Sequence, residues 1–314
     1  MSRSAPAVSS ARLAAKPPWL TEKRRSSLAA YMYISPFFIL FAVFGVYPIF
    51  FTIYLSFFKW NGLSAMKFNG FTNYELVLGD PLFWSSFYNT LIMGVLGTVP
   101  QLIIALLLAV ILHNGIKRFK KTLRAIFFLP NITSVVAVTI VFGALFSARG
   151  MANQFLDWIG LDSVAWTADY WGVKVAVAMM VMWRWLGYNA IIYLSGLQSI
   201  PPELYEAAKI DGASASKALL YITLPLLKPF IVFTVLISTI GSLQLFTEPF
   251  VFLSPGGTGS TREEGITMVI YMYGEAFRNG FFGTAAATSV ILFIFTILFS
   301  LFNMWITKKS GGDA

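Results

Sequence analysis

Long apolar stretches recur along the chain and are separated by shorter polar segments. A helix needs about 20 apolar residues to cross a bilayer, and six stretches approach or exceed that length: 29–58, 85–112, 125–147, 171–196, 230–253 and 282–307. Lipid offers no partner to backbone polar groups, so each stretch is expected to be helical. The pattern predicts an all-α, polytopic membrane helical bundle with about six transmembrane helices.

The overall composition agrees with this prediction. The 314 residues are 57% hydrophobic and 12% charged, whereas soluble domains are roughly 45 to 50% apolar. The first apolar stretch follows three basic residues, as in a signal peptide, but it is about twice as long as a signal-peptide core and lacks a small-residue cleavage site. It is therefore interpreted as an uncleaved first helix.

The sequence divides into three parts. Residues 1–28, rich in Ser, Ala, Pro and basic side chains, are predicted to form a disordered cytoplasmic N-terminal tail. Residues 29–307 form the predicted transmembrane domain, and residues 308–314 a short cytoplasmic C-terminal tail.

The basic residues are distributed unevenly. Sixteen of the 23 Lys and Arg residues lie before residue 30, within 113–124, within 198–228 or after residue 307, whereas the intervening loops carry five basic and eight acidic residues. By the positive-inside rule, both termini and the two basic connections are expected in the cytoplasm. This distribution accounts for the net charge of +9 and makes nucleic acid an unfavoured partner.

Several kinds of chemistry are excluded by residue content. The chain has no cysteine and a single histidine, His113, which excludes disulfides, thiolate or His-cluster metal sites and a Ser-His-Asp triad. The nearest approach to a phosphate-binding G-x-x-x-x-G-K-[ST] motif, at residues 212–217, lacks the second glycine and the Ser or Thr after the lysine. We therefore expect no catalytic residue, metal or cofactor, and no ATP bound by this chain.

The connection between the fourth and fifth stretches, residues 198–228, has the sequence of a folded segment. Pro201, Pro202 and Glu203 are typical of a helix start, a short helix over 204–210 is expected to follow, and Asp211 with Gly212 supplies its stop. A second helix over 213–224 then leads back to the membrane. The predicted topology places both helices in the cytoplasm.

This segment resembles the EAA loop of ABC importer permeases. The resemblance is carried by Glu206, Ala207, Ala208 and Gly212, with Leu224 and Pro225 following, and it covers YEAAKIDGASASKALLYITLPLLKP at 205–229. Further similarity to the maltose and lactose type of carbohydrate importer lies at 36–62, Asn73, 80–84, 89–91, RAIFFLP at 124–130, Gly150, Asn153, Leu156 and 244–257.

The resemblance implies a permease subunit that carries a sugar, with a di- or oligosaccharide expected, from an extracytoplasmic binding protein across the cytoplasmic membrane of a prokaryote. Implied partners are a second, homologous permease subunit, two ATP-binding subunits, the binding protein and membrane lipid. The loop would be a coupling helix, in which Glu206, Ala207, Ala208, Asp211 and Gly212 contact an ATP-binding subunit. A helix that merely lies on the membrane surface is the alternative interpretation.

Polar residues inside the apolar stretches are candidates for the substrate pathway, because they are costly in a bilayer. Arg184 lies midway along the fourth stretch, with Tyr188 one helical turn beyond it and Asn189 beside that face. Gln244 and Glu248 are one turn apart on the fifth stretch, and an ion pair between Arg184 and Glu248 would have to bridge a difference in depth. A purely structural role for these charges stays open, as does a sugar site in the partner subunit.

Three other functions compete with sugar import. The same kind of subunit could carry another solute, such as a glycerol phosphate or a polyol. A stand-alone secondary transporter would show inverted repeats and intramembrane acidic relays, and the sequence offers no clear repeat. A membrane-embedded transferase would need paired carboxylates, which the loop residues Glu203, Glu206 and Asp211 imitate.

Overall fold

The computed structural model describes residues 22–114, 120–254 and 263–309 of the chain. These residues fall into two units, 1–52 and 53–314, which are considered separately. The predicted tail residues 1–21 and 310–314 lie outside the described residues.

The first unit contains helix α1 (Glu22–Phe41), the π-helical turn η1 (Ala42–Val46) and the start of helix α2 (Tyr47–Leu55). Helix α1 begins at Glu22, so the predicted disorder of residues 22–28 is wrong. No proline or glycine lies between Glu22 and Ser35 to end a helix that extends outward from the apolar stretch. The turn η1 ends two residues before Pro48, which cannot donate the usual helical hydrogen bond.

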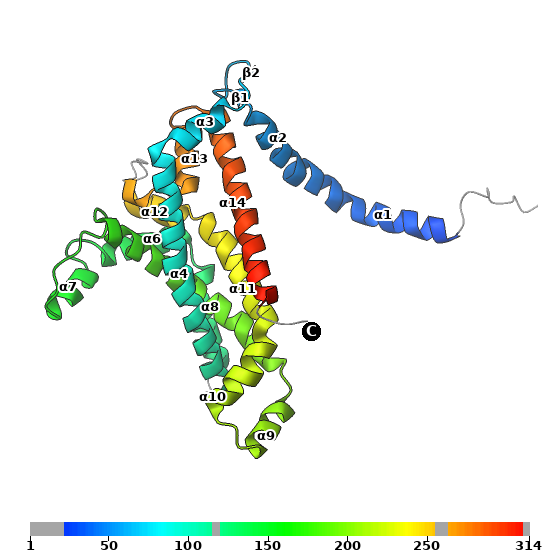
Figure 1. Cartoon of the computed structure of the whole chain (residues 1–314), viewed down its shortest axis with the longest axis vertical. Coiled ribbons are helices and arrows are strands. Elements are labelled where there is room, and N and C mark those ends of the chain that lie inside the picture. Colours follow the sequence, from blue (N-terminus) through cyan, green and yellow to red (C-terminus); the bar gives the residue numbers. More distant parts are fainter. Residues whose placement is uncertain (1–21, 115–119, 255–262, 310–314) are drawn as a thin grey trace, which may run out of the picture. The chain divides into compact units, whose positions relative to one another are not determined.

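The second unit begins with the last residues of α2, forms a short hairpin and continues almost entirely as helices (Figure 1). Strands β1 (Phe58–Lys59) and β2 (Lys67–Phe68) pair antiparallel, so Phe58 lies in a strand and not in the first span as predicted. The helical elements that follow are α3 (Thr72–Gly79), α4 (Pro81–Asn114), α5 (Lys120–Ile132), α6 (Val135–Leu145), α7 (Met151–Trp158), α8 (Tyr170–Gln198), α9 (Pro202–Ile210), α10 (Ala215–Ala218), η2 (Leu219–Thr223), α11 (Leu224–Leu243), α12 (Thr247–Leu253), η3 (Glu263–Gly265), α13 (Met268–Phe277) and α14 (Phe282–Lys309).

Three long helices form the centre of this unit. Helix α4 packs along α8, and α11 contacts α4, α8 and α14. Figure 1 shows α9 at one end of these helices and the hairpin at the other. A glycine also allows α5 to approach α8 closely. A Cβ on Gly187 of α8 would overlap the carbonyl oxygen of Phe127 in α5, so α5 lies directly against the α8 backbone.

The third predicted span is broken. Helices α5 and α6 meet at an angle of 94° across Thr133 and Ser134. Pro130 weakens the end of α5, and the Asn, Thr and Ser residues that follow favour local side-chain hydrogen bonds over helix. The prediction of one continuous helix over 125–147 is therefore wrong.

The fifth predicted span is also broken, at Gln244–Phe246. Had the helix continued, the ring of Pro249 would have met the carbonyl of Leu245, four residues before it. The break instead places Pro249 in the first turn of α12, where its missing N–H is not needed. The hydroxyl of Thr267 donates to the freed carbonyl of Leu245 at 2.6 Å, which satisfies it inside the protein.

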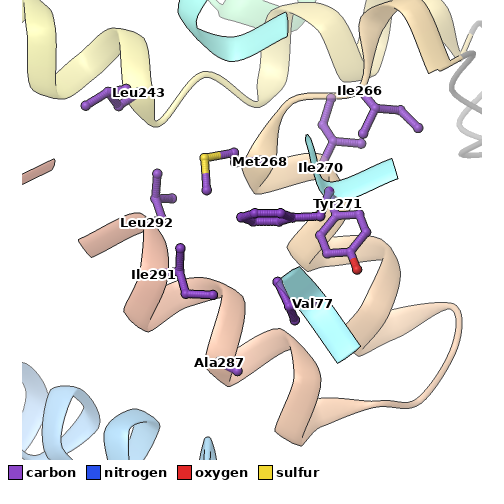
Figure 2. Close-up of a cluster of buried hydrophobic side chains, with 10 residues drawn as sticks. Val77, Leu243, Ile266, Met268, Ile270, Tyr271, Ala287, Ile291 and Leu292 are labelled. Carbon is purple, nitrogen blue, oxygen red and sulfur yellow. The ribbon is translucent and has the colours of Figure 1, made fainter. Parts of the chain in front are cut away.

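Three buried hydrophobic clusters hold the helices together. The first joins α3, α11, α13 and α14, and Figure 2 shows Tyr271, Met268 and Ile291 packed within it. The second joins α4, α8 and α12 around Met180 and Phe252, and the third joins α4, α8 and α11 around Tyr193 and Leu227. The outward faces of these helices carry exposed Leu, Ile, Val and Phe side chains, as lipid contact requires.

Within the described residues, five helices are long and apolar enough to cross a membrane, or six if α5 and α6 count as one span. The predicted all-α, polytopic membrane fold is confirmed. Helix α14 continues to Lys309, so residues 308–309 belong to the last helix and not to the predicted tail.

Candidate functional site

A cavity of about 400 Å³ lies between α4, α8, α11 and the start of α12. All five residues predicted to line a substrate pathway line this cavity: Arg184, Tyr188, Asn189, Gln244 and Glu248. The sequence prediction had placed Gln244 and Glu248 on one helix face. The structure instead places Gln244 at the C-terminal cap of α11 and Glu248 in the first turn of α12.

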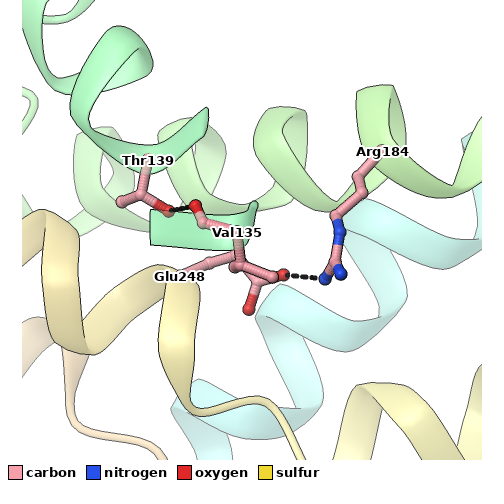
Figure 3. Close-up of polar contacts among 4 residues, drawn as sticks. All are labelled: Val135, Thr139, Arg184 and Glu248. Atoms are coloured by element: carbon pink, nitrogen blue, oxygen red, sulfur yellow. Dashed lines mark hydrogen bonds and ion pairs between the residues drawn. The ribbon is translucent and has the colours of Figure 1, made fainter. Parts of the chain in front are cut away.

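Arg184 and Glu248 form an ion pair despite their different depths in the predicted spans. Arg184 Nη1 donates to Glu248 Oε1 at 3.3 Å (Figure 3), and the two side chains are 19% and 8% exposed. Thr139 on α6 lies near this pair in the same view and donates to its own helix at Val135 O. The pair joins α8 to the first turn of α12, just after the break between α11 and α12. Because the two charges are opposite, the wall of the cavity is close to neutral.

Aromatic side chains form a corner of the cavity beside the ion pair. The rings of Trp185 and Tyr188 meet edge to face, with centroids 5.6 Å apart and planes at 85°. The guanidinium carbon of Arg184 lies 5.4 Å from the Trp185 ring centroid. Aromatic faces next to planar polar groups can pack against C–H surfaces while hydrogen bonds fix the hydroxyls of a ligand.

Helix α4 also lines the cavity, although none of its residues was predicted as part of the substrate pathway. Gly94, Thr98 and Gln101 line the cavity from one face of this helix, and a Cβ on Gly94 would approach Ser242 of α11 to 3.1 Å. Gln101 is 1% exposed, and its Nε2 has no hydrogen-bond partner among the described residues. Its spacing of seven residues from Gly94, two helical turns, was the signal that could have identified it.

The predicted coupling residues lie together on α9 and the turn after it. Glu206, Ala207, Asp211 and Gly212 are exposed, and Ala208 is half-buried. Gly212 has φ +75°, and the turn ends α9 with a Schellman motif in which Ala213 N donates to Ala208 O at 2.9 Å and Gly212 N to Lys209 O at 3.2 Å.

This projecting segment is tied to the bundle. Tyr205 OH and Thr223 Oγ1 form a hydrogen bond of 3.0 Å between α9 and η2. The predicted second helix over 213–224 is α10 together with η2, and both continue directly into α11. Ile210 is 86% exposed at the end of α9, so the segment presents an apolar side chain beside the carboxylate of Asp211.

Polar side chains fix the opposite end of the bundle, at positions for which the sequence predicted no role. Lys174 of α8 is fully buried and donates to the carbonyl of Glu264 at 3.1 Å, while Asn89 of α4 donates to those of Glu263 and Ile266 at 2.7 and 3.1 Å. Asn153 bonds both backbone groups of Val164. These residues hold loops in place. Asn89 and Asn153 are among the residues that carry the resemblance to carbohydrate importers, and these hydrogen bonds give both a structural role.

Residues 83–310 match the family described as binding-protein-dependent transport system inner membrane component. The arabinooligosaccharides transport system permease protein AraP of Halalkalibacterium halodurans is 37% identical over 88% of this chain and 87% of the relative. The lactose transport system permease protein LacF of Rhizobium radiobacter is 35% identical over 91% and 96%.

A solved structure shares the fold. A chain in the crystal structure of a bacterial ABC transporter involved in the import of the acidic polysaccharide alginate has a TM-score of 0.78 to this protein. The match covers 92% of this chain and 98% of that chain at 23% identity.

Proposed function

We propose, because the chain belongs to the family of binding-protein-dependent transport system inner membrane components, that it is the permease subunit of an ATP-driven ABC importer for a sugar. A di- or oligosaccharide, delivered by an extracytoplasmic binding protein, would pass through this subunit or along its boundary with a partner into the cytoplasm. The relatives named above, which transport arabinooligosaccharides and lactose, support this substrate class.

The observation that carries the proposal is the chemistry of the cavity. Arg184, Gln244 and Glu248 supply planar polar groups beside the Trp185 and Tyr188 rings, inside a bundle whose other faces are apolar. The cavity volume of about 400 Å³ falls within the range of roughly 300 to 1,000 Å³ that is typical of small-molecule sites.

The charge balance of the cavity favours a neutral sugar. The positive charge of Arg184 is matched by Glu248 at 3.3 Å, and no other Lys, Arg, Asp or Glu side chain lines this cavity in the described part of the chain. A phosphate or carboxylate substrate would compete with Glu248 for the guanidinium. A glycerol phosphate is therefore the less favoured cargo.

Transport would be driven from α9. Its small residues and exposed Ile210 suit a groove on an ATP-binding subunit, and Glu206 can pair with a basic group there. The partners would be two such subunits, which bind the ATP, a second homologous permease subunit, the binding protein and the surrounding lipid. This chain itself would bind no cofactor.

The orientation follows from the charge distribution. Both termini, residues 113–124 and the segment 198–228 would lie in the cytoplasm. The cysteine-free chain offers a direct test, in which a single cysteine replaces Ser214. An impermeant thiol reagent should leave it unlabelled in intact spheroplasts and label it in inside-out vesicles, and the opposite result would reverse the topology.

The function is tested with the complete complex in proteoliposomes. ATP hydrolysis stimulated by the binding protein is measured with lactose, maltose, arabinotriose and glycerol 3-phosphate. Stimulation by one of the sugars is the expected result. Stimulation by glycerol 3-phosphate alone would assign the other cargo, and uptake by this chain without ATP-binding subunits would indicate a secondary transporter.

A further inference from the structure

The cavity ends toward α9 in a layer of polar residues. Gln101 of α4, Asn189 of α8 and Ser238 of α11 line it there, and Asn189 Nδ2 donates to Ser238 Oγ at 3.4 Å. We call these three residues the polar floor. Three different helices therefore each contribute one small polar side chain to the end of the cavity.

The next helical turn on each of the three helices closes the bundle. Ala105, Tyr193 and Thr234, each four residues from a floor residue, are 0%, 2% and 1% exposed. The hydroxyls of Tyr193 and Thr234 bond each other at 2.7 Å. The hydroxyls of the closing turn satisfy each other, so the polar floor is the first layer above it whose polar side chains border the cavity.

Gln101 differs from its two neighbours in having an unpartnered donor. Gln101 is 1% exposed, yet its Nε2 has no hydrogen-bond partner among the described residues. Leaving a buried amide unpaired is unfavourable, because the group loses its water without gaining a protein acceptor. Leu or Met would fill the same space without this cost, so the amide is explained by a ligand that it contacts.

We propose that the polar floor is a sugar subsite in which Gln101 Nε2 donates to a hydroxyl oxygen of the transported sugar, with Asn189 and Ser238 beside it. This inference rests on the proposed function and extends it to α4 and to a specificity-determining residue. A sugar that lacks this hydroxyl leaves the Gln101 amide without a hydrogen-bond acceptor and is bound more weakly.

The test measures sugar binding to the purified complex without its binding protein, because the binding protein has its own affinity for sugar. The unfolding midpoint is followed against increasing lactose, maltose or arabinotriose. In Gln101→Leu we expect two effects: apparent affinity falls roughly two- to tenfold, and the sugar-free complex unfolds at a higher temperature. Gln154→Leu on α7, an exposed glutamine outside the cavity, should leave the affinity unchanged.

A series of sugar derivatives identifies which hydroxyl Gln101 contacts. Monodeoxy derivatives of whichever of the three sugars binds are compared in wild type and in Gln101→Leu. One derivative should bind more weakly to wild type, and the variant should no longer distinguish it from the parent sugar.

Unchanged affinity in Gln101→Leu, with a lower unfolding midpoint, would make Gln101 a packing residue and overturn the inference. If Gln101→Leu does not assemble, Gln101→Met supplies the same comparison with an unbranched side chain. A wild-type complex that binds none of the sugars and whose ATP hydrolysis ignores them would instead overturn the proposed function.

Discussion

Removing one member of the buried ion pair separates its structural role from a role in transport. The perturbations are Arg184→Met, Glu248→Leu and the double variant, which replace charged groups by apolar ones of similar length. In each single variant a charge is left among helices without its partner. In the double variant neither charge remains, and the packing between α8 and α12 is largely kept.

The size of the effect follows from the distance and the burial. Two unit charges 3.3 Å apart interact by about 5 kcal/mol at an effective dielectric constant of about 20. Most of this attraction offsets the cost of removing both groups from water. Each single variant should therefore be destabilised by about 3 to 5 kcal/mol, and the double variant by much less.

The measurement is thermal unfolding of the detergent-solubilised chain, followed by sugar uptake in proteoliposomes. The single variants should unfold on the order of 5 to 10 °C lower than wild type, and the double variant within a few degrees of it. Recovered stability without recovered uptake would place the charges in the substrate path, whereas recovery of both would make them structural. Additive losses of stability in the double variant would refute the ion-pair reasoning altogether.

Three further predictions concern other parts of the molecule. Glu206→Lys or Gly212→Trp should leave insertion intact but abolish sugar-stimulated ATP hydrolysis, and wild-type uptake at equal abundance would contradict the coupling role. Gly187→Ala should lower the unfolding midpoint strongly, because its Cβ would overlap the carbonyl of Phe127, so an unchanged midpoint would refute that packing. Burial and the nearby Asp80 raise the pKa of Glu275 above 4.5, while the hydrogen bond from Asn279 lowers it by less. The folded protein therefore holds this proton more tightly than the unfolded chain, and the free energy of unfolding should fall as pH rises from about 4.5. Glu275→Gln should make the free energy of unfolding less dependent on pH in this range.

The positions of the helices were predictable because hydropathy and helix signals are local properties of the sequence. Long apolar runs located the spans within several residues of their observed bounds. The stop at Gly212 was predictable because a helix end needs a residue that adopts positive φ readily, and Gly212 has φ +75°. The helix over 204–210 was likewise confirmed as α9.

The two broken spans were missed although part of the signal was local. Hydropathy averages over a window and does not respond to a single backbone clash, so the effect of Pro249 on Leu245 went unnoticed. At Ser134 the signal was a run of polar helix-breaking residues inside an apolar stretch. The first break turns the chain by 94° between α5 and α6, and the break in the fifth span places Glu248 in a helix of its own.

Other features depend on residues that are far apart in the sequence. The buried ammonium of Lys174 donates to the carbonyl of Tyr170, one turn away, and to that of Glu264, 90 residues away. No local pattern in the sequence predicts the second partner. Gathering the predicted pathway residues around one cavity likewise required the packing of α4, α8 and α11. That these residues bind a sugar remains a prediction, since their shared cavity establishes proximity and not occupancy.

The arrangement of the coupling segment bears on how motion would reach the cavity. Three residues separate the end of α8 at Gln198 from the start of α9 at Pro202, and η2 leads directly into α11, so α9 is joined to two of the helices that line the cavity. The bond between Tyr205 and Thr223 ties the two connections together. A displacement of α9 by an ATP-binding subunit would therefore move α8 and α11 jointly. The polar floor, with Asn189 on α8 and Ser238 on α11, would be displaced with them, and a sugar bound there would respond to ATP.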